Sequence, residues 1–230
     1  MNRRVAASAI QTFGPSAPNV IPMAAFFLFA WLAPFLGLGS WEYPLRCVLL
    51  GLVLWLFSAD VIDLRVRSLG LSLLLGVAVF VLWIGPDVLI AGYRSHWLFQ
   101  NSILGRLKMD APAELSGSAM ALLFRSIRAA VLVPIIEELF WRAWLMRWLI
   151  DKDFHRVALG TYQAAAFGIT ALLFASEHGP YWEVGLLTGL IYNWWMVRTK
   201  SLGDMILVHG VTNACLSAYV IYSGKWEYWL

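Results

Sequence analysis

The chain has 230 residues, of which 60% are hydrophobic and 13% are charged, and its mean hydropathy is +0.70. Such values are unusual for a soluble domain of this size and typical of a polytopic membrane protein. The net charge of +3 and the sequence pI near 9.0 therefore do not point to a nucleic-acid partner, and the basic residues are better explained as determinants of membrane topology.

Apolar runs separated by short charged or Gly/Pro-containing links predict an all-α fold: a polytopic transmembrane helical bundle of about seven spans, or eight if the longest run is divided. We expect a single membrane domain. Residues 1–114 would form the N-terminal spans and an interfacial segment, and residues 115–222 would form the core that carries the chemistry. The predicted spans are 20–38, 44–62, 68–90, 118–150, 160–177, 181–197 and 203–222.

Two segments depart from a regular span. Residues 93–117 are mixed in polarity, so we expect a short amphipathic helix and a loop at the membrane surface. The run 118–150 would be about 50 Å long as a helix, whereas the hydrocarbon core is about 30 Å thick. We expect this helix to overhang the membrane, with Arg125 and Arg128 at the surface, and to kink at Pro134 just before two adjacent glutamates.

The distribution of basic residues favours an orientation with the N-terminus inside and the C-terminus outside. The nine basic residues on the inner side would be Arg3, Arg4, Arg65, Arg67, Arg147, Lys152, Arg156, Arg198 and Lys200. The outer side would hold Arg46, Arg94, Arg106, Lys108 and Lys225, with Arg125 and Arg128 at a span edge. We expect an integral membrane protein, and the family resemblance described below implies that the membrane is a bacterial inner (cell) membrane.

The fourth span carries two adjacent carboxylates, Glu137 and Glu138, at a depth where an unpaired charge costs about 3 kcal/mol or more. Arg142 follows Glu138 by four residues and shares its helical face, so we expect these two to form a structural ion pair. Glu137 points about 100° away and has no local cation, so we expect it to face a cavity and act as a general base. The alternative is that both glutamates only bind Arg142 and a neighbouring helix.

Two later spans each carry a histidine. His178 ends the fifth span four residues after Phe174, although a single histidine at a helix end is more often an interfacial group than a catalytic one. His209 and Asn213 are four residues apart and project together into the bundle, where such a pair can also serve only to join two helices. Taken together with Glu137, these groups can form a hydrolytic site with a base, a water-positioning imidazole and oxyanion donors.

Three motifs lie in order along the chain, each on a separate hydrophobic span: EELFWR at 137–142, FASEH at 174–178 and HGVTN at 209–213. They resemble the EExxxR, FxxxH and HxxxN motifs of the CAAX prenyl endopeptidase (Rce1-like) and bacteriocin-immunity (CPBP) group of intramembrane proteases. Each motif alone is weak, whereas the ordered trio is specific. The stretches VPIIEELFWRAWLMRWL, DFHRVALGTY and YNWWMVRTKSLGD further resemble the bacterial CAAX-protease-related proteins of exosortase or protein-sorting systems.

This resemblance implies a glutamate-dependent intramembrane endopeptidase that hydrolyses peptide bonds of membrane-associated protein or peptide substrates. It implies that Glu137 activates water with the help of His178, and that an oxyanion is stabilised at the third motif. The catalytic residues would be Glu137, His178, His209 and Asn213, and the supporting residues would be Glu138, Arg142 and Phe174. No cofactor is expected, and zinc held by Glu137, His178 and His209 is the alternative. The expected partners are the lipid bilayer, the substrate and components of a protein-sorting system, with no nucleic acid.

Two other functions fit the same residues. A non-catalytic membrane immunity or binding protein of the same fold would sequester a partner through helix contacts. A proton-coupled transporter can also use intramembrane Glu and His, although the sequence shows no inverted repeat. The presence of the complete polar set favours the enzyme, because a scaffold has no need of groups that are so costly to bury.

Overall fold

The computed structural model describes residues 2–107 and 109–229, with side chains described from residue 8 onward. Within these ranges the chain forms helices, turns and one isolated antiparallel bridge between Asn101 and Gly105, and no strand. The predicted all-α fold is therefore confirmed. Of the residues used for the orientation, Lys108 and the side chains of Arg3 and Arg4 lie outside the described part.

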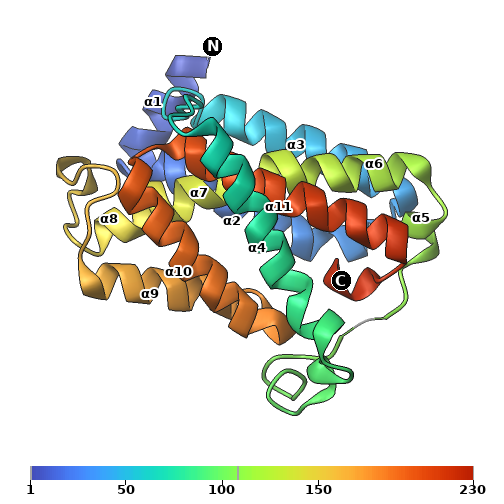
Figure 1. Ribbon diagram of the computed structural model, residues 1–230. Helices are drawn as coiled ribbons and strands as arrows, with labels where there is room; N and C mark the ends of the chain where they lie inside the picture. Colours follow the sequence, from blue (N-terminus) through green and yellow to red (C-terminus); the bar gives the residue numbers. More distant parts are fainter. Residues whose placement is uncertain (1, 108, 230) are drawn as a thin grey trace.

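Long helices pack into one bundle, with α11 running through its middle and α4 crossing over it (Figure 1). The helix α10 packs along α9, and α2 packs along α3. The main helices are α1 (Asn2–Phe13), α2 (Ala17–Leu36), α3 (Glu42–Phe57), α4 (Leu69–Leu89), α6 (Ala119–Ile127), α7 (Val133–Phe140), α9 (Ala164–Ser176), α10 (Trp182–Thr199) and α11 (Leu202–Ser223). Short helices are α5 (Ala113–Ser116) and α8 (Met146–Trp148).

In the described part of the chain, five helical stretches are long and apolar enough to cross a membrane. They are Ala17–Leu36, Gly39–Phe57, Leu69–Leu89, Ala119–Trp148 and Leu202–Ser223. The apolar helix α9 has 13 residues and is about 20 Å long, which is shorter than a usual span. These helices make the chain an integral membrane protein, and the expected number of about seven spans stays a prediction.

The long fourth span is one helical column interrupted by two π-helical segments, η3 (Arg128–Leu132) and η4 (Trp141–Leu145). In η3 the backbone N–H of Val133 donates to the carbonyl of Arg128, five residues earlier. In the same register the carbonyl of Ala129 would need the N–H of Pro134, and proline has none. The disturbance expected before the glutamates is therefore a wide helical turn that leaves a backbone carbonyl free.

The expectation that Arg125 and Arg128 lie at the surface is wrong. Arg128 is only 6% exposed, Arg125 is half-buried, and both line an internal cavity. This end of α6 is covered because the C-terminal segment packs on it, and Arg125 Nη2 donates to the carbonyl oxygen of Trp229 at 2.6 Å. The neighbouring helix α3 also packs against α6, with the Cys47 thiol donating to a carbonyl of α6. These contacts join segments that are remote in sequence.

Residues 93–117 form mainly turns, and the expected amphipathic helix is reduced to the four residues of α5. The segment is fixed by Arg94, whose guanidinium lies 3.0 Å from Asp87 and 2.6 Å from Glu183. Arg94 Nη1 also donates to the carbonyl oxygen of Pro180 at 2.7 Å, and Trp182 Nε1 donates to the segment's backbone at 3.0 Å. The segment therefore folds over the start of α10 as a loop held by buried ion pairs.

The start of α11 is fixed against the start of α4 by the buried carboxylate of Asp204. It accepts hydrogen bonds from the backbone N–H groups of Arg67 and Ser68 at 2.6 and 2.9 Å and from Ser72 Oγ at 2.7 Å. Further along, a Cβ at Gly76 would lie 2.8 Å from the carbonyl oxygen of Val208, so the two backbones are in contact there. This close packing sets the position of the histidine that α11 carries.

Candidate active site

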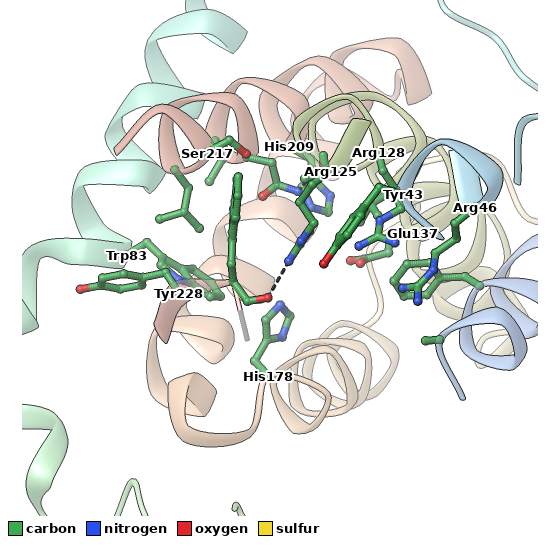
Figure 2. Close-up of a pocket in the computed structure, with 18 of the residues that line it drawn as sticks. Tyr43, Arg46, Trp83, Arg125, Arg128, Glu137, His178, His209, Ser217 and Tyr228 are labelled. Carbon is green, nitrogen blue, oxygen red and sulfur yellow. Dashed lines mark hydrogen bonds between the residues drawn. The ribbon is translucent and has the colours of Figure 1, made fainter. Parts of the chain in front are cut away.

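The predicted site residues converge on one partly open cavity of about 650 Å³. Its walls come mainly from α2, α3, α4, α7, α10 and α11, from the segment η3, from the ends of α6 and α9, and from the C-terminal residues (Figure 2). The lining includes all of the residues that were expected to be catalytic: Glu137, His178, His209 and Asn213. Three separate helical segments therefore bring these side chains to a common space, as the expected site requires.

Glu138 is completely buried and forms the ion pair that the i,i+4 spacing predicted. Its Oε1 lies 3.1 Å from Nη1 of Arg142, which is also completely buried. The same oxygen lies 2.8 Å from Nδ1 of His209. On its other side, the Arg142 guanidinium donates from Nε to Asn193 Oδ1 at 3.0 Å and lies 4.5 Å above the ring of Phe174. Oε1 of Glu138 is thus shared by two partners, its Oε2 has no partner among the described residues, and Glu138 does not line the cavity.

Glu137 differs from its neighbour in both contacts and surroundings. Its side chain is 8% exposed and lines the cavity, and its Oε2 has no hydrogen-bond partner among the described residues. Figure 2 shows its carboxylate at the cavity wall, with His209 and His178 on other walls. A carboxylate oxygen with free lone pairs in a cavity can accept a proton from a water molecule bound there.

The ring of His178 is oriented by contacts that fix its tautomer. Its Nδ1 lies 2.7 Å from the carbonyl oxygen of Phe174, and since a carbonyl only accepts, Nδ1 carries the proton. In the neutral ring, Nε2 is then an acceptor. The ring packs edge-on against Trp83 at 5.2 Å, and a Cβ at Gly185 would lie 3.2 Å from its Cγ. The FxxxH spacing therefore places an oriented hydrogen-bond acceptor in the cavity.

The depth of His178 follows from the length of α9. A helix that crossed the whole membrane would have carried this residue to the surface, about 12 Å away from Glu137 along the membrane normal. The observed α9 ends at Ser176 after 13 residues, and the loop 93–107 lies over its end, with Gly179 packed against the carbonyl of Leu104. A short helix beneath a loop thus lets His178 line the same cavity as Glu137.

Asn213 has a backbone contact that the sequence did not reveal. Its Nδ2 donates to the carbonyl oxygen of Ala129 at 2.8 Å, the group whose helical partner would have been the missing N–H of Pro134. One turn earlier, a Cβ at Gly210 would lie 2.8 Å from the carbonyl oxygen of Ala130. Asn213 therefore satisfies the broken helix with one N–H and keeps a second N–H for a ligand.

Sequence reasoning missed some residues of this site. Asn193 joins Arg142 to the carbonyl oxygen of Phe167, to which its Nδ2 donates at 2.8 Å. Tyr192 packs 5.4 Å from the ring of His209 and donates its hydroxyl hydrogen to Thr212 at 2.9 Å. A buried asparagine in the apolar run YNWWM was a signal for Asn193, because an amide in a membrane helix needs a partner. Glu177 is exposed and accepts from Trp141 Nε1 at 3.2 Å.

Within the described residues, no three His, Cys, Asp or Glu side chains are placed to hold one metal ion. The set considered for zinc was Glu137, His178 and His209. Both histidines use Nδ1 for contacts inside the protein, which leaves Nε2 as their possible ligand atom, but the described geometry does not gather the three donors around one point. These side chains therefore do not fit a zinc site, and metal independence stays a prediction.

The apolar helices and the buried Glu–His–Asn cluster define a membrane protein with a polar site enclosed in its bundle. Residues 119–215 match the family described as type II CAAX prenyl endopeptidase Rce1-like. The matched segment is less than half of the chain, contains all three motifs and is similar to this family of CAAX intramembrane proteases. Comparisons with curated proteins and with solved structures find no match.

The two glutamates should differ in their effect on stability. Replacing Glu138 by Gln or Arg142 by Ala breaks a fully buried pair, and we expect the free energy of unfolding to fall by about 3–5 kcal/mol. Glu137→Gln removes an unpartnered carboxylate and should leave stability unchanged or higher. Thermal unfolding of the purified variants in detergent measures this difference. A Glu137→Gln protein that unfolds as readily as Glu138→Gln would contradict the assignment.

Asn213 should contribute to stability through its bond to the broken helix. Asn213→Ala leaves the carbonyl of Ala129 without a donor, so we expect a loss of about 1–3 kcal/mol. The control is Ser223→Ala on the same helix, where an exposed hydroxyl bonds only to its own helix and the loss should be within about 0.5 kcal/mol. Equal unfolding temperatures for the two variants would show that the hydrogen bond from Asn213 does not contribute to stability.

Proposed function

We propose that this protein is a glutamate-dependent intramembrane endopeptidase that hydrolyses peptide bonds of membrane-associated proteins or peptides and needs no cofactor. The supporting observation is the contrast between the two glutamates. Glu138 is paired through its Oε1 with both Arg142 and His209 and does not line the cavity, whereas Glu137 has no ion pair among the described residues and lines the cavity together with both histidines.

The first step uses a water molecule between Glu137 and His178. The water donates one hydrogen bond to the Glu137 carboxylate and the other to Nε2 of His178, which directs its oxygen lone pair toward the substrate carbonyl. As the water oxygen bonds to the carbonyl carbon, Glu137 takes its proton. Glu137 later gives this proton to the amine that leaves when the C–N bond breaks. Two well-placed acceptors thus activate and orient one nucleophile.

Negative charge develops on the substrate oxygen during this attack, and two groups on α11 can stabilise it. The second N–H of Asn213 is free of its bond to Ala129 and can donate to the oxyanion. Nε2 of His209 can also donate when the ring carries two protons, with Nδ1–H held by Glu138. The Glu138 carboxylate offsets the charge of that imidazolium, so Arg142, Glu138 and His209 act as one unit.

The setting proposed for this activity is a bacterial inner membrane, with the lipid bilayer around the bundle and components of a protein-sorting system as partners. Supporting this placement are the apolar helices and the likeness of three sequence stretches to sorting-associated proteins of the same group. The cavity reaches residues of α2, including Phe26 and Pro34, so an apolar peptide segment has a hydrophobic wall to lie against.

Glu137→Gln should abolish cleavage while the protein remains folded. Loss of a general base costs about 10²- to 10⁴-fold in rate, because the water is no longer deprotonated as it attacks. The measurement is mass-spectrometric detection of products from a panel of membrane peptides incubated with purified protein in liposomes. The matched control is Asp153→Asn, an exposed acid outside the cavity, which should cleave like the wild type. Unchanged cleavage by Glu137→Gln would show that Glu137 is not the general base. If neither the wild type nor any variant cleaves a peptide, the immunity or binding role is favoured.

Chelation should leave the activity largely unchanged, because the proposed steps use only side chains and water. Cleavage is compared before and after treatment with EDTA or 1,10-phenanthroline, and the metal content is measured by elemental analysis. Loss of cleavage that returns on addition of zinc, together with stoichiometric zinc in the protein, would establish the metal-dependent alternative.

A further inference from the structure

Three arginines gather along one part of the cavity wall and have no role in the proposed hydrolysis. Arg46 comes from the first turns of α3, and Arg125 and Arg128 come from the end of α6 and the π-helical turn after it. Figure 2 shows these three side chains at the cavity together with Tyr43. Arg46 and Arg128 lie on the side of the cavity away from Trp83. We call Arg46, Arg125 and Arg128 the arginine cluster.

The partners of the cluster leave one guanidinium uncompensated. Arg46 forms an ion pair with Glu42, the acid of the same helix turn that also lines the cavity. Arg125 donates to the backbone carbonyl of Trp229. Arg128 is 94% buried, and its Nε and Nη1 have no hydrogen-bond partner among the described residues. Three positive charges therefore meet one negative charge at this place.

A buried and unpaired guanidinium is costly inside a membrane protein. Arginine remains charged, and its burial at membrane depth costs about 3 kcal/mol or more unless an anion or a set of acceptors compensates it. The planar group with its several donors matches a carboxylate or phosphate in two-point hydrogen bonding. Such an arrangement, aimed into a cavity, is suited to a negatively charged ligand.

We propose that the arginine cluster, with Arg128 at its centre, binds a carboxylate of the peptide substrate. This inference rests on the proposed function and names a feature of its substrate. Arg128 and Glu137 lie on one helical column nine residues apart, which corresponds to about 13 Å. An extended peptide covers that distance in about four residues. A carboxylate about four residues from the scissile bond, either the chain terminus or an acidic side chain, reaches the cluster while the bond lies at Glu137.

The location of Arg128 favours a peptide carboxylate over a lipid phosphate. The guanidinium faces the same cavity as Glu137, so a ligand that occupies the site extends to it without leaving the protein. The free donors belong to one arginine, because Arg46 and Arg125 already have partners, and a single guanidinium matches a singly charged carboxylate. A headgroup phosphate would have to enter the cavity together with its acyl chains.

The test measures binding without hydrolysis. A dansylated heptapeptide of leucine and alanine is titrated, as free acid and as amide, into detergent-solubilised protein that carries Glu137→Gln. Energy transfer from the tryptophans of the protein, of which Trp83 and Trp229 line the cavity, reports occupancy. We expect the free acid to bind at least about tenfold more tightly than the amide, because it gains a charge-assisted pair. Amidated peptides with a single glutamate at each of the last four positions show whether a side-chain carboxylate serves instead.

Arg128→Gln, in the same background, should reduce the acid-to-amide preference to about one. The matched control is Arg156→Gln, which removes an exposed arginine outside the cavity and should keep the preference. Equal binding of acid and amide with no gain from glutamate, or a preference that survives Arg128→Gln, would overturn the proposal. Arg128-dependent binding of dihexanoyl phosphatidylglycerol without any carboxylate preference would make the cluster a lipid-headgroup site and would also overturn it.

Thermal unfolding separates ligand binding from a structural role. Arg128→Gln should unfold at the same temperature as the parent or higher, since it removes an uncompensated buried charge, whereas a structural arginine would leave its partners unpaired and lower the temperature. A clear drop would count against the proposal. Cleavage by the wild type without a carboxylate preference refutes only the cluster's role. A preference without cleavage of any peptide refutes the hydrolase and leaves the binding site.

Discussion

The structure depends on one buried carboxylate, that of Glu138, which neutralises a charge and joins helices at the same time. It pairs with Arg142 one turn along its own column and with His209 of α11. Arg142 then reaches Asn193 on α10 and the ring of Phe174 on α9. Because each of these groups is unfavourable in a membrane unless it has its partner, these contacts favour the observed packing of the four segments.

The second constraint is the break in the fourth span. Pro134 cannot supply a backbone N–H, and the carbonyl of Ala129 that this leaves without a helical partner accepts from Asn213 of α11, while Gly210 of α11 packs closely against the carbonyl of Ala130. The residues of the third motif therefore serve the fold and the proposed chemistry together. The carbonyl of Ala129 needs a hydrogen-bond donor from outside its own helix. Asn213 supplies this donor, and the contact places its side chain beside the cavity.

The cavity combines a compensated and an uncompensated set of charges. Glu138, Arg142 and His209 are bonded to one another, whereas the side chains of Glu137 and Arg128 line the cavity without an ion pair among the described residues. Unsatisfied groups of this kind reduce stability and are retained at sites where a ligand or reaction uses them. A carboxylate that accepts a proton and a guanidinium that binds an anion would together fix both the position and the chain direction of a bound peptide.

Periodicity and composition alone determined the all-α membrane fold, the pairing of Glu138 with Arg142 and the separate direction of Glu137, because these follow from spacing along a single helix. Only the tertiary structure decided the contacts of His209 with Glu138 and of Asn213 with Ala129, which join residues 71 and 84 positions apart. It also turned Arg125 and Arg128 into the cavity and ended α9 below the loop that covers it. Those outcomes depend on which helices become neighbours. A polar residue in an apolar helix indicates that it needs a hydrogen-bond partner, but the sequence of that helix does not show which residue the partner is.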